Sequence, residues 1–137
     1  MHYTIHTDGG ARGNPGPAGA GVVIESEGIK IELKKYLGIK TNNQAEYEAL
    51  ILALEHILVE FAHNSKIVSV FCFLDSELVV KQLQGQYKIK HERLKPLSER
   101  VKSLSHQFQE IHFNHIPRTE NQEADKLVNE AIDENQS

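Results

Sequence analysis

The amino-acid sequence predicts an α/β fold in which helices flank one mixed five-stranded sheet. Three strand-like segments follow one another at the N-terminus with only turn signals between them, which is typical of an antiparallel meander. Two later strand-like segments, 66–74 and 109–116, each follow a segment with helical spacing. A right-handed crossover would then place segment 66–74 parallel to the first strand. The sheet would therefore contain three antiparallel strands followed by two crossover strands.

The first three strands are predicted at 2–7, 19–25 and 29–37. Residues 2–7 alternate, and an acidic residue, Asp8, closes the segment. Four glycines and two prolines then fall within residues 9–17, which predicts a tight loop. Glu27-Gly28 is the turn signal between the second and third strands.

A long helix is predicted over 41–62, because apolar residues keep helical spacing along it. Thr41 or the asparagines after it can cap the first turn, and Glu46 falls near the positive end of the helix dipole. Segment 66–74 is nearly continuously apolar, as expected for a central strand covered on both faces.

The C-terminal half alternates between helices and a strand. Gly85 stops the first of these helices, and Pro96 sits in the first turn of the second, where proline is tolerated. The expected helices are 77–84, 92–107 and 121–132, with the alternating strand 109–116 before the last. From Asp133 onward the polar residues predict a frayed tail.

Length and composition predict a single domain over residues 1–137. No apolar run is long enough for a membrane span, the N-terminus lacks a signal-peptide pattern, and Cys72 has no disulfide partner. We therefore expect a cytoplasmic protein without membrane association. No apolar stripe demands a partner, so a monomer is the default expectation. The net charge of −4 argues against a general polyanion binder, although lysines and arginines concentrate between Lys81 and Lys102.

Four carboxylates are candidates for one site. Asp8 and Asp75 each end a predicted strand at the sheet edge where open α/β sheets bind ligands, Glu46 opens the helix between them, and Asp125 lies on the last helix. Each has an ordinary alternative: Asp75 as a helix cap, Glu46 as a dipole partner, Asp125 as one of several solvated acids. Together they would repel unless cations neutralise them. Mg²⁺ or Mn²⁺ prefers such oxygen ligands, and two ions could activate water for phosphoryl displacement.

The sequence resembles the type 1 ribonuclease H family, from about Tyr3 to Ala131. The resemblance lies in four motifs that occur in family order, namely Thr7-Asp8-Gly9-Gly10 with Gly13-Asn14-Pro15-Gly16, Thr41-Asn42-Asn43-Gln44-Ala45-Glu46, Asp75-Ser76, and Glu120-Asn121-Gln122-Glu123-Ala124-Asp125. It implies the ribonuclease H-like fold and hydrolysis of the RNA strand of an RNA–DNA hybrid. The products would carry 5′-phosphate and 3′-hydroxyl ends.

The resemblance also assigns residues. Asp8, Glu46, Asp75 and Asp125 match the metal-binding catalytic acids, with two ions expected when substrate is bound. Matches to the substrate-contacting residues are Asn14, Asn42 and Asn43 for the RNA minor groove, Thr41 for a DNA phosphate, and Gly9 and Gly10 for close backbone approach to the RNA. Amide side chains can recognise a 2′-hydroxyl, although Asn42 and Asn43 could instead serve only as cap and turn residues.

Three departures from the family pattern matter. The basic insertion that many members carry after the helix following Asp75 is absent, so hybrid affinity would depend on nearby basic residues such as Lys90. His91 occupies a position in the DNA-phosphate pocket where asparagine is frequent, and Glu77 stands where glutamine is common. The loop before Asp125 lacks the histidine that some relatives use in product release, and Arg118 is the candidate phosphate-facing cation there, with a solvated loop arginine as the alternative.

Two other functions stay open at this point. A ribonuclease H-like module that binds nucleic acid without cutting it would explain Glu77, His91 and the missing insertion. Activity on double-stranded RNA is the second, because minor-groove contacts with one strand do not require the other to be DNA.

Overall fold

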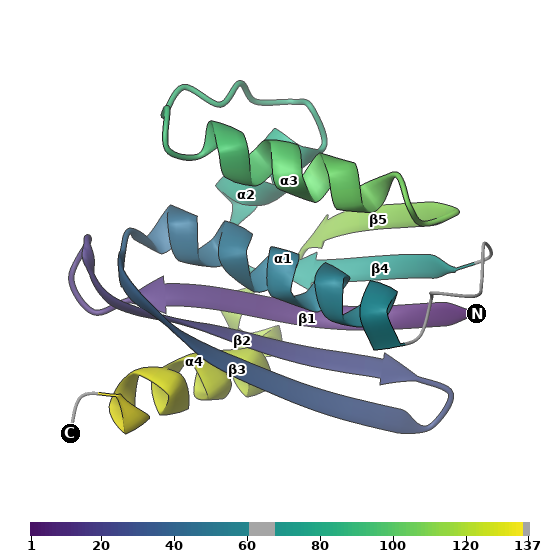
Figure 1. The fold of residues 1–137 in the computed structure, drawn as a ribbon, viewed down its shortest axis with the longest axis horizontal. Coiled ribbons are helices and arrows are strands. Elements are labelled where there is room, and N and C mark those ends of the chain that lie inside the picture. Colours follow the sequence, from purple (N-terminus) through teal and green to yellow (C-terminus); the bar gives the residue numbers. More distant parts are fainter. Residues whose placement is uncertain (61–67, 136–137) are drawn as a thin grey trace.

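The computed structural model describes residues 1–60 and 68–135 and confirms the predicted architecture (Figure 1). The strands are β1 (His2–Ala11), β2 (Gly16–Ser26), β3 (Ile29–Lys40), β4 (Ser69–Leu74) and β5 (Glu110–His115). The helices are α1 (Asn42–Glu60), α2 (Glu77–Leu83), α3 (Lys95–Ser105), the short 3₁₀ helix η1 (Arg118–Glu120) and α4 (Gln122–Glu134).

The sheet has the strand order β3-β2-β1-β4-β5. The first three strands pair antiparallel, whereas β4 is parallel to β1 and β5 is parallel to β4. The predicted crossover is thus confirmed. The parallel register ends with Thr7 opposite Leu74, so the residues that follow, Asp8 and Asp75, lie at the same edge of the sheet.

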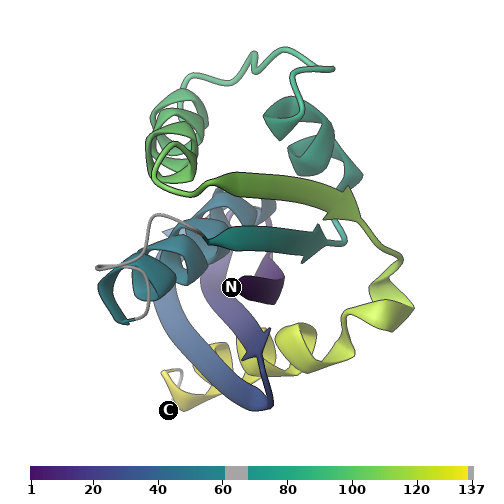
Figure 2. The ribbon, with the colours of Figure 1, turned by 90° about the vertical axis from the view of Figure 1, so that its right-hand side faces the viewer.

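Helices cover the sheet from both sides (Figures 1 and 2). α1 lies along β1 with α3 beside it, and α4 packs on β2 and β3. The neighbouring residues Gly9 and Gly10 show the two layers, since Gly9 faces Ala45 of α1 and Gly10 faces Val128 of α4. Tyr3, Ile5, Leu50, Leu54 and Ile57 are among the buried side chains that form the core between β1 and α1.

The glycine-rich segment differs from its prediction. β1 continues through Asp8 to Ala11 and β2 begins at Gly16, so the loop contains only residues 12–15. The expectation that Asp8 closes a strand is therefore wrong: Asp8 is paired with Gly21 inside the ladder. Gly9 allows close backbone contact rather than a turn, because a Cβ there would lie 2.1 Å from the Ala45 carbonyl carbon, whereas Gly13 has a positive φ of 90° in the loop.

Other boundaries differ by a few residues. β3 extends to Lys40, and α3 begins at Lys95 because Pro96 fits only the first helical turn. α4 continues to Glu134 instead of ending before a frayed tail, since Asp133 pairs with Arg12 and Glu134 with Lys34. The predicted end of the first helix and the start of the fourth strand fall within 61–67, outside the described residues. In the part of the chain that is described, no helix has the length and apolar character needed to cross a bilayer.

Candidate active site

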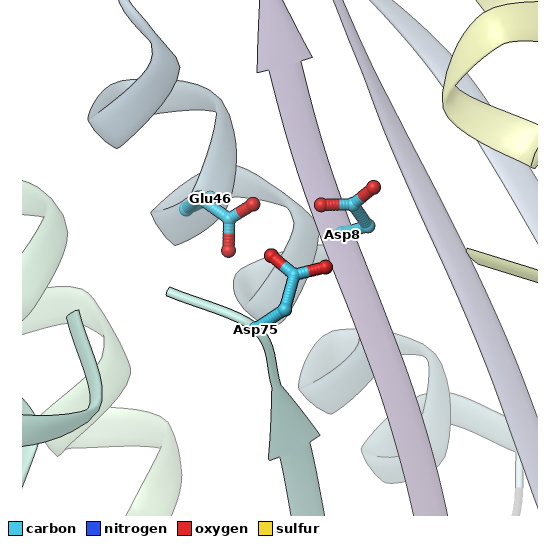
Figure 3. Close-up of side chains that lie close together, drawn as sticks. All are labelled: Asp8, Glu46 and Asp75. Atoms are coloured by element: carbon cyan, nitrogen blue, oxygen red, sulfur yellow. The ribbon is translucent and has the colours of Figure 1, made fainter. Parts of the chain in front are cut away.

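Asp75 directly follows the last residue of β4 and precedes α2. The helix cap there is Ser76, whose Oγ accepts a hydrogen bond from the Val79 N–H at 3.3 Å. Capping therefore does not occupy the Asp75 carboxylate, which turns toward β1 (Figure 3). The alternative reading of Asp75 as a cap is wrong.

Glu46 is placed by the start of α1. Thr41 and Gln44 form a capping box: the Thr41 hydroxyl accepts from the Gln44 N–H, and the Gln44 side chain accepts from the Thr41 N–H. The first turn of α1 contains no acidic residue, so Glu46 lies too far along the helix to stabilise it through the helix dipole. Its Oε1 instead accepts a hydrogen bond from the Gly9 N–H at 2.9 Å. This bond fixes the side chain beside β1.

Three carboxylates meet at this point (Figure 3). Asp8, Glu46 and Asp75 each offer an oxygen, and these oxygens all lie within 4.8 Å of one another. Asp8 is 7% exposed and Glu46 is 5% exposed. Glu46 Oε2 is buried and has no hydrogen-bond partner among the described residues. A buried acceptor without a donor beside two further acids suits a hard divalent cation.

The electrostatics of the acids agree with this geometry. Burial raises the pKa of Asp8 to about 7, and the charges of Asp75 and Asp125 add to the rise. Burial also raises the pKa of Glu46, and the Asp8 charge raises it further. The acids therefore disfavour one another's ionised forms, which a bound cation would reverse.

Asp125 joins the cluster through the packing of α4. A Cβ on Gly21 would lie 2.2 Å from the Ala124 carbonyl oxygen, so only glycine allows α4 this close to β2. Gly21 is the pairing partner of Asp8, and α4 thereby brings Asp125 close enough to Asp8 for its charge to raise the Asp8 pKa. The structure thus brings together all four acids named from the sequence, with Asp125 outside the close group of three.

The candidate substrate residues gather mainly around one cleft of about 740 Å³ beside the N-terminus of α1. Five of them line it, namely Asn14, Thr41, Asn43, Lys90 and His91. Asn42 lies at the loop, where its Oδ1 accepts from the Ala11 N–H and its own N–H donates to Asn14 Oδ1. The Asn42 and Asn14 side chains therefore connect the loop to the start of α1 through hydrogen bonds.

The remaining candidates lie elsewhere. Gly9 packs under α1 and Gly10 against Val128, and neither lines the cleft. Arg118 is exposed and begins η1, shortly after the end of β5. The Ile116 N–H donates to the Leu74 carbonyl, so this segment lies at the sheet edge where β4 also ends. The Glu77 side chain is exposed and forms an ion pair with Lys81 at 3.5 Å.

Two residues of the site were missed by sequence reasoning. Asn121 is buried, and its amide donates to Asp75, although its position before a helix signals only a cap. Gln82 lines the cleft and accepts a 2.7 Å hydrogen bond from the buried Tyr47 hydroxyl. A glutamine among the apolar residues of a short helix was the signal for it.

Comparisons with known proteins agree with these features. The family model described as "Reverse transcriptase-like" matches residues 6–131. The chain is 39% identical over 136 residues to the bifunctional protein Rv2228c of Mycobacterium tuberculosis, covering 97% of this chain but only 36% of that protein. It is 41% identical over 129 residues to a ribonuclease HI of Halobacterium salinarum, covering 93% of this chain and 62% of that protein.

A solved structure matches over nearly the whole chain. It is LC11-RNase H1 in complex with an RNA/DNA hybrid, with a TM-score of 0.92 and 47% identity, covering 98% of this chain and 99% of that one.

Proposed function

Because the chain belongs to the type 1 ribonuclease H family, we propose that it is a metal-dependent endoribonuclease that hydrolyses the RNA strand of RNA–DNA hybrids. The products would carry 5′-phosphate and 3′-hydroxyl ends. The observation that carries the proposal is the cluster of Asp8, Glu46 and Asp75 oxygens within 4.8 Å, with Asp125 near enough to Asp8 for its charge to raise the Asp8 pKa. The hybrid complex of LC11-RNase H1 supports the choice of substrate.

The donor set fits Mg²⁺ or Mn²⁺. All four ligands are carboxylates, and the unpartnered Glu46 Oε2 is an acceptor suited to a cation. These acids would hold two such ions, and the chemistry supplied there would be activation of a water for attack on phosphorus and stabilisation of the departing 3′-oxygen. Because the acids lie at the sheet edge, the attacking water and the scissile phosphate would have to be brought into line at that edge.

The cleft supplies the binding surface in this proposal. Asn14 and Asn43 would face 2′-hydroxyls of the RNA strand, while Thr41, Lys90 and His91 would contact a phosphate of the DNA strand. Arg118, at the same edge of the sheet as Asp75, would offer a cation to the phosphate backbone. These contacts would distinguish the RNA strand from the DNA strand and direct the RNA strand to the acids.

The proposal is tested with an end-labelled RNA strand paired with either DNA or RNA, with Mg²⁺ and Mn²⁺ compared. Internal cuts in the hybrid with either ion are the expected result. The absence of cutting with both ions would contradict the enzymatic function. Cutting of the RNA–RNA duplex would extend the substrate range.

A nucleic-acid-binding module without activity is the second candidate. Glu77 favours it, because an exposed carboxylate two residues after Asp75 repels a phosphate backbone. Salt-dependent hybrid binding without cleavage in either ion would support this candidate. A monomeric state and a cytoplasmic location remain predictions from the sequence.

A further inference from the structure

One buried side chain connects the acid cluster with the start of α4. Asn121 is 1% exposed and lies directly before that helix. Its Nδ2 donates to the Thr7 carbonyl oxygen at 2.9 Å and to Asp75 Oδ2 at 3.1 Å. Because a carbonyl oxygen can only accept, the NH₂ end of the amide must face these two groups. The orientation of Asn121 is therefore set by β1 and by Asp75.

The position of Asn121 suggests a helix cap, but its side chain makes no capping hydrogen bond. The main-chain carbonyl instead accepts from the Asp125 N–H at 3.1 Å. The residue thus contacts Asp75 through its side chain and Asp125 through its backbone. Two of the four acids are tied to this one asparagine.

Asp75 depends on such a partner more than the buried acids Asp8 and Glu46 do. Asp8 lies within β1, and Glu46 is held by the Gly9 N–H. Asp75 is only half-buried and lies between β4 and α2, outside any strand or helix. In the described part of the chain, the hydrogen bond to its carboxylate comes from Asn121. Without that bond, the carboxylate would be free to change rotamer.

We propose that Asn121 is a positioning residue of the metal site: it fixes the Asp75 carboxylate beside Asp8 and Glu46 and thereby strengthens binding of a divalent cation. The inference rests on the proposed function for the cation and extends it to a residue outside the acid set. An ordered ligand loses less rotamer freedom when the cation binds, so affinity rises. Partners that orient metal ligands in this way typically change metal affinity or activity by about 10- to 100-fold.

The test is calorimetric titration of Mn²⁺ into the 137-residue protein without nucleic acid. Asn121→Leu removes both hydrogen bonds while roughly keeping the side-chain volume, and Asn121→Ala is the second variant. Asn135→Ala is the matched control, because Asn135 also donates its amide to a backbone carbonyl, that of Ala131, but near the far end of α4. We expect Mn²⁺ affinity to fall about tenfold in both Asn121 variants and to stay unchanged in the control.

A double-mutant cycle with Asp75→Ala separates positioning from general stability. If Asn121 acts through Asp75, Asn121→Leu weakens Mn²⁺ binding no further in the Asp75→Ala background. Folded Asn121 variants with wild-type Mn²⁺ affinity would overturn the inference, and so would failure of both variants to fold, which would make the role purely structural. Wild-type protein that binds Mn²⁺ but cuts no hybrid would contradict the proposed function alone.

Discussion

The acid cluster and the cleft beside it are built in opposite ways. Asp8 and Glu46 of the cluster are buried, and close backbone contacts hold the cluster, with Gly9 under α1 and Gly21 under α4. The cleft is open, and its basic side, Lys88, Lys90 and His91, comes from exposed residues between α2 and α3. Its asparagines and Thr41 lie in loops and at a helix start.

This difference separates chemistry from binding. Close backbone packing holds the carboxylates of the cluster near one another, whereas the exposed side chains of the cleft can be removed without loss of the fold. Changes in the cluster should therefore reduce kcat or stability. Changes in the cleft should act on KM and on its salt dependence.

The largest expected effect is that of Asp75→Asn. The substitution keeps the shape and removes the charge, so cleavage should fall by about 10³-fold or more, because a metal ligand supplies several kcal/mol of transition-state stabilisation. Single-turnover cleavage of a labelled hybrid measures it, with circular dichroism to show that the fold is kept. Asp133→Asn, which changes only the surface ion pair with Arg12, is the control. Cutting by Asp75→Asn at the wild-type rate would remove Asp75 from the site.

The second effect is a pH dependence of stability without metal. Burial raises the pKa of Asp8 to about 7, so between about pH 4 and 7 the folded state keeps a proton that the unfolded state releases. Stability should therefore fall as pH rises through this window, by up to about 4 kcal/mol, and the loss should be complete above it. The Asp8→Asn variant has no carboxyl proton at this position and should lack this contribution to the pH dependence of stability.

Urea unfolding with a chelator, at about pH 4 and about pH 8, measures this difference. The wild type should lose more stability between the two pH values than Asp8→Asn does, and Mn²⁺ should restore the wild type at the higher pH. Equal losses in the two proteins would show that Asp8 ionises freely.

The third effect is on the packing that brings Asp125 to Asp8. Gly21→Ala would place a methyl group 2.2 Å from the Ala124 carbonyl oxygen, so α4 must move and stability should drop by about 3 kcal/mol. Gly10→Ala is the matched control, because its methyl group would lie 3.6 Å from Val128 Cγ1, an ordinary contact. Thermal unfolding distinguishes them. Equal stability of the two variants would show that α4 is not held this closely.

The packing role of these glycines could not be predicted from the sequence, although other features of the site could. Strand order and the sheet edge that brings Asp8 and Asp75 together could be predicted, because apolar periodicity and crossover handedness determine them. That Asp8 lies within β1 could not, since a glycine that admits a neighbouring backbone looks the same in sequence as a glycine that turns the chain. Only three-dimensional packing distinguishes the two.

Asn121 and Gln82 were missed for a related reason. A buried amide is recognised by its partners, and those of Asn121, Thr7 and Asp75, lie 114 and 46 residues away. Gln82 bonds to Tyr47, 35 residues away. No local pattern encodes such pairs, whereas the capping box at Thr41 and Gln44 is local and could be anticipated as a helix start.

The fourth effect concerns the cleft. Lys90→Ala should raise KM for the hybrid by about 3- to 10-fold and reduce the salt slope of binding by about 1, with kcat unchanged, because one phosphate contact is lost. Lys30→Ala, which removes a lysine paired with Glu123 on the other side of the sheet, is the control of equal charge. A drop in kcat instead of a rise in KM would show that Lys90 acts in catalysis, like the acids, rather than in substrate binding.

The smallest effect expected is that of Glu77→Gln at the start of α2. Glu77 is solvent-exposed and pairs with Lys81, so its charge is screened, and neutralising it should tighten hybrid binding only about twofold. Glu130→Gln on α4 is the matched control, since Glu130 also pairs with a lysine, Lys34, but on the opposite layer from the cleft. Binding measured at low and high salt separates the two sites. A gain for Glu77→Gln that disappears at high salt and is absent for Glu130→Gln would place the hybrid backbone over the start of α2. An equal gain in both variants would reflect net charge alone, and the hybrid would then pass α2 at a distance beyond the Debye length.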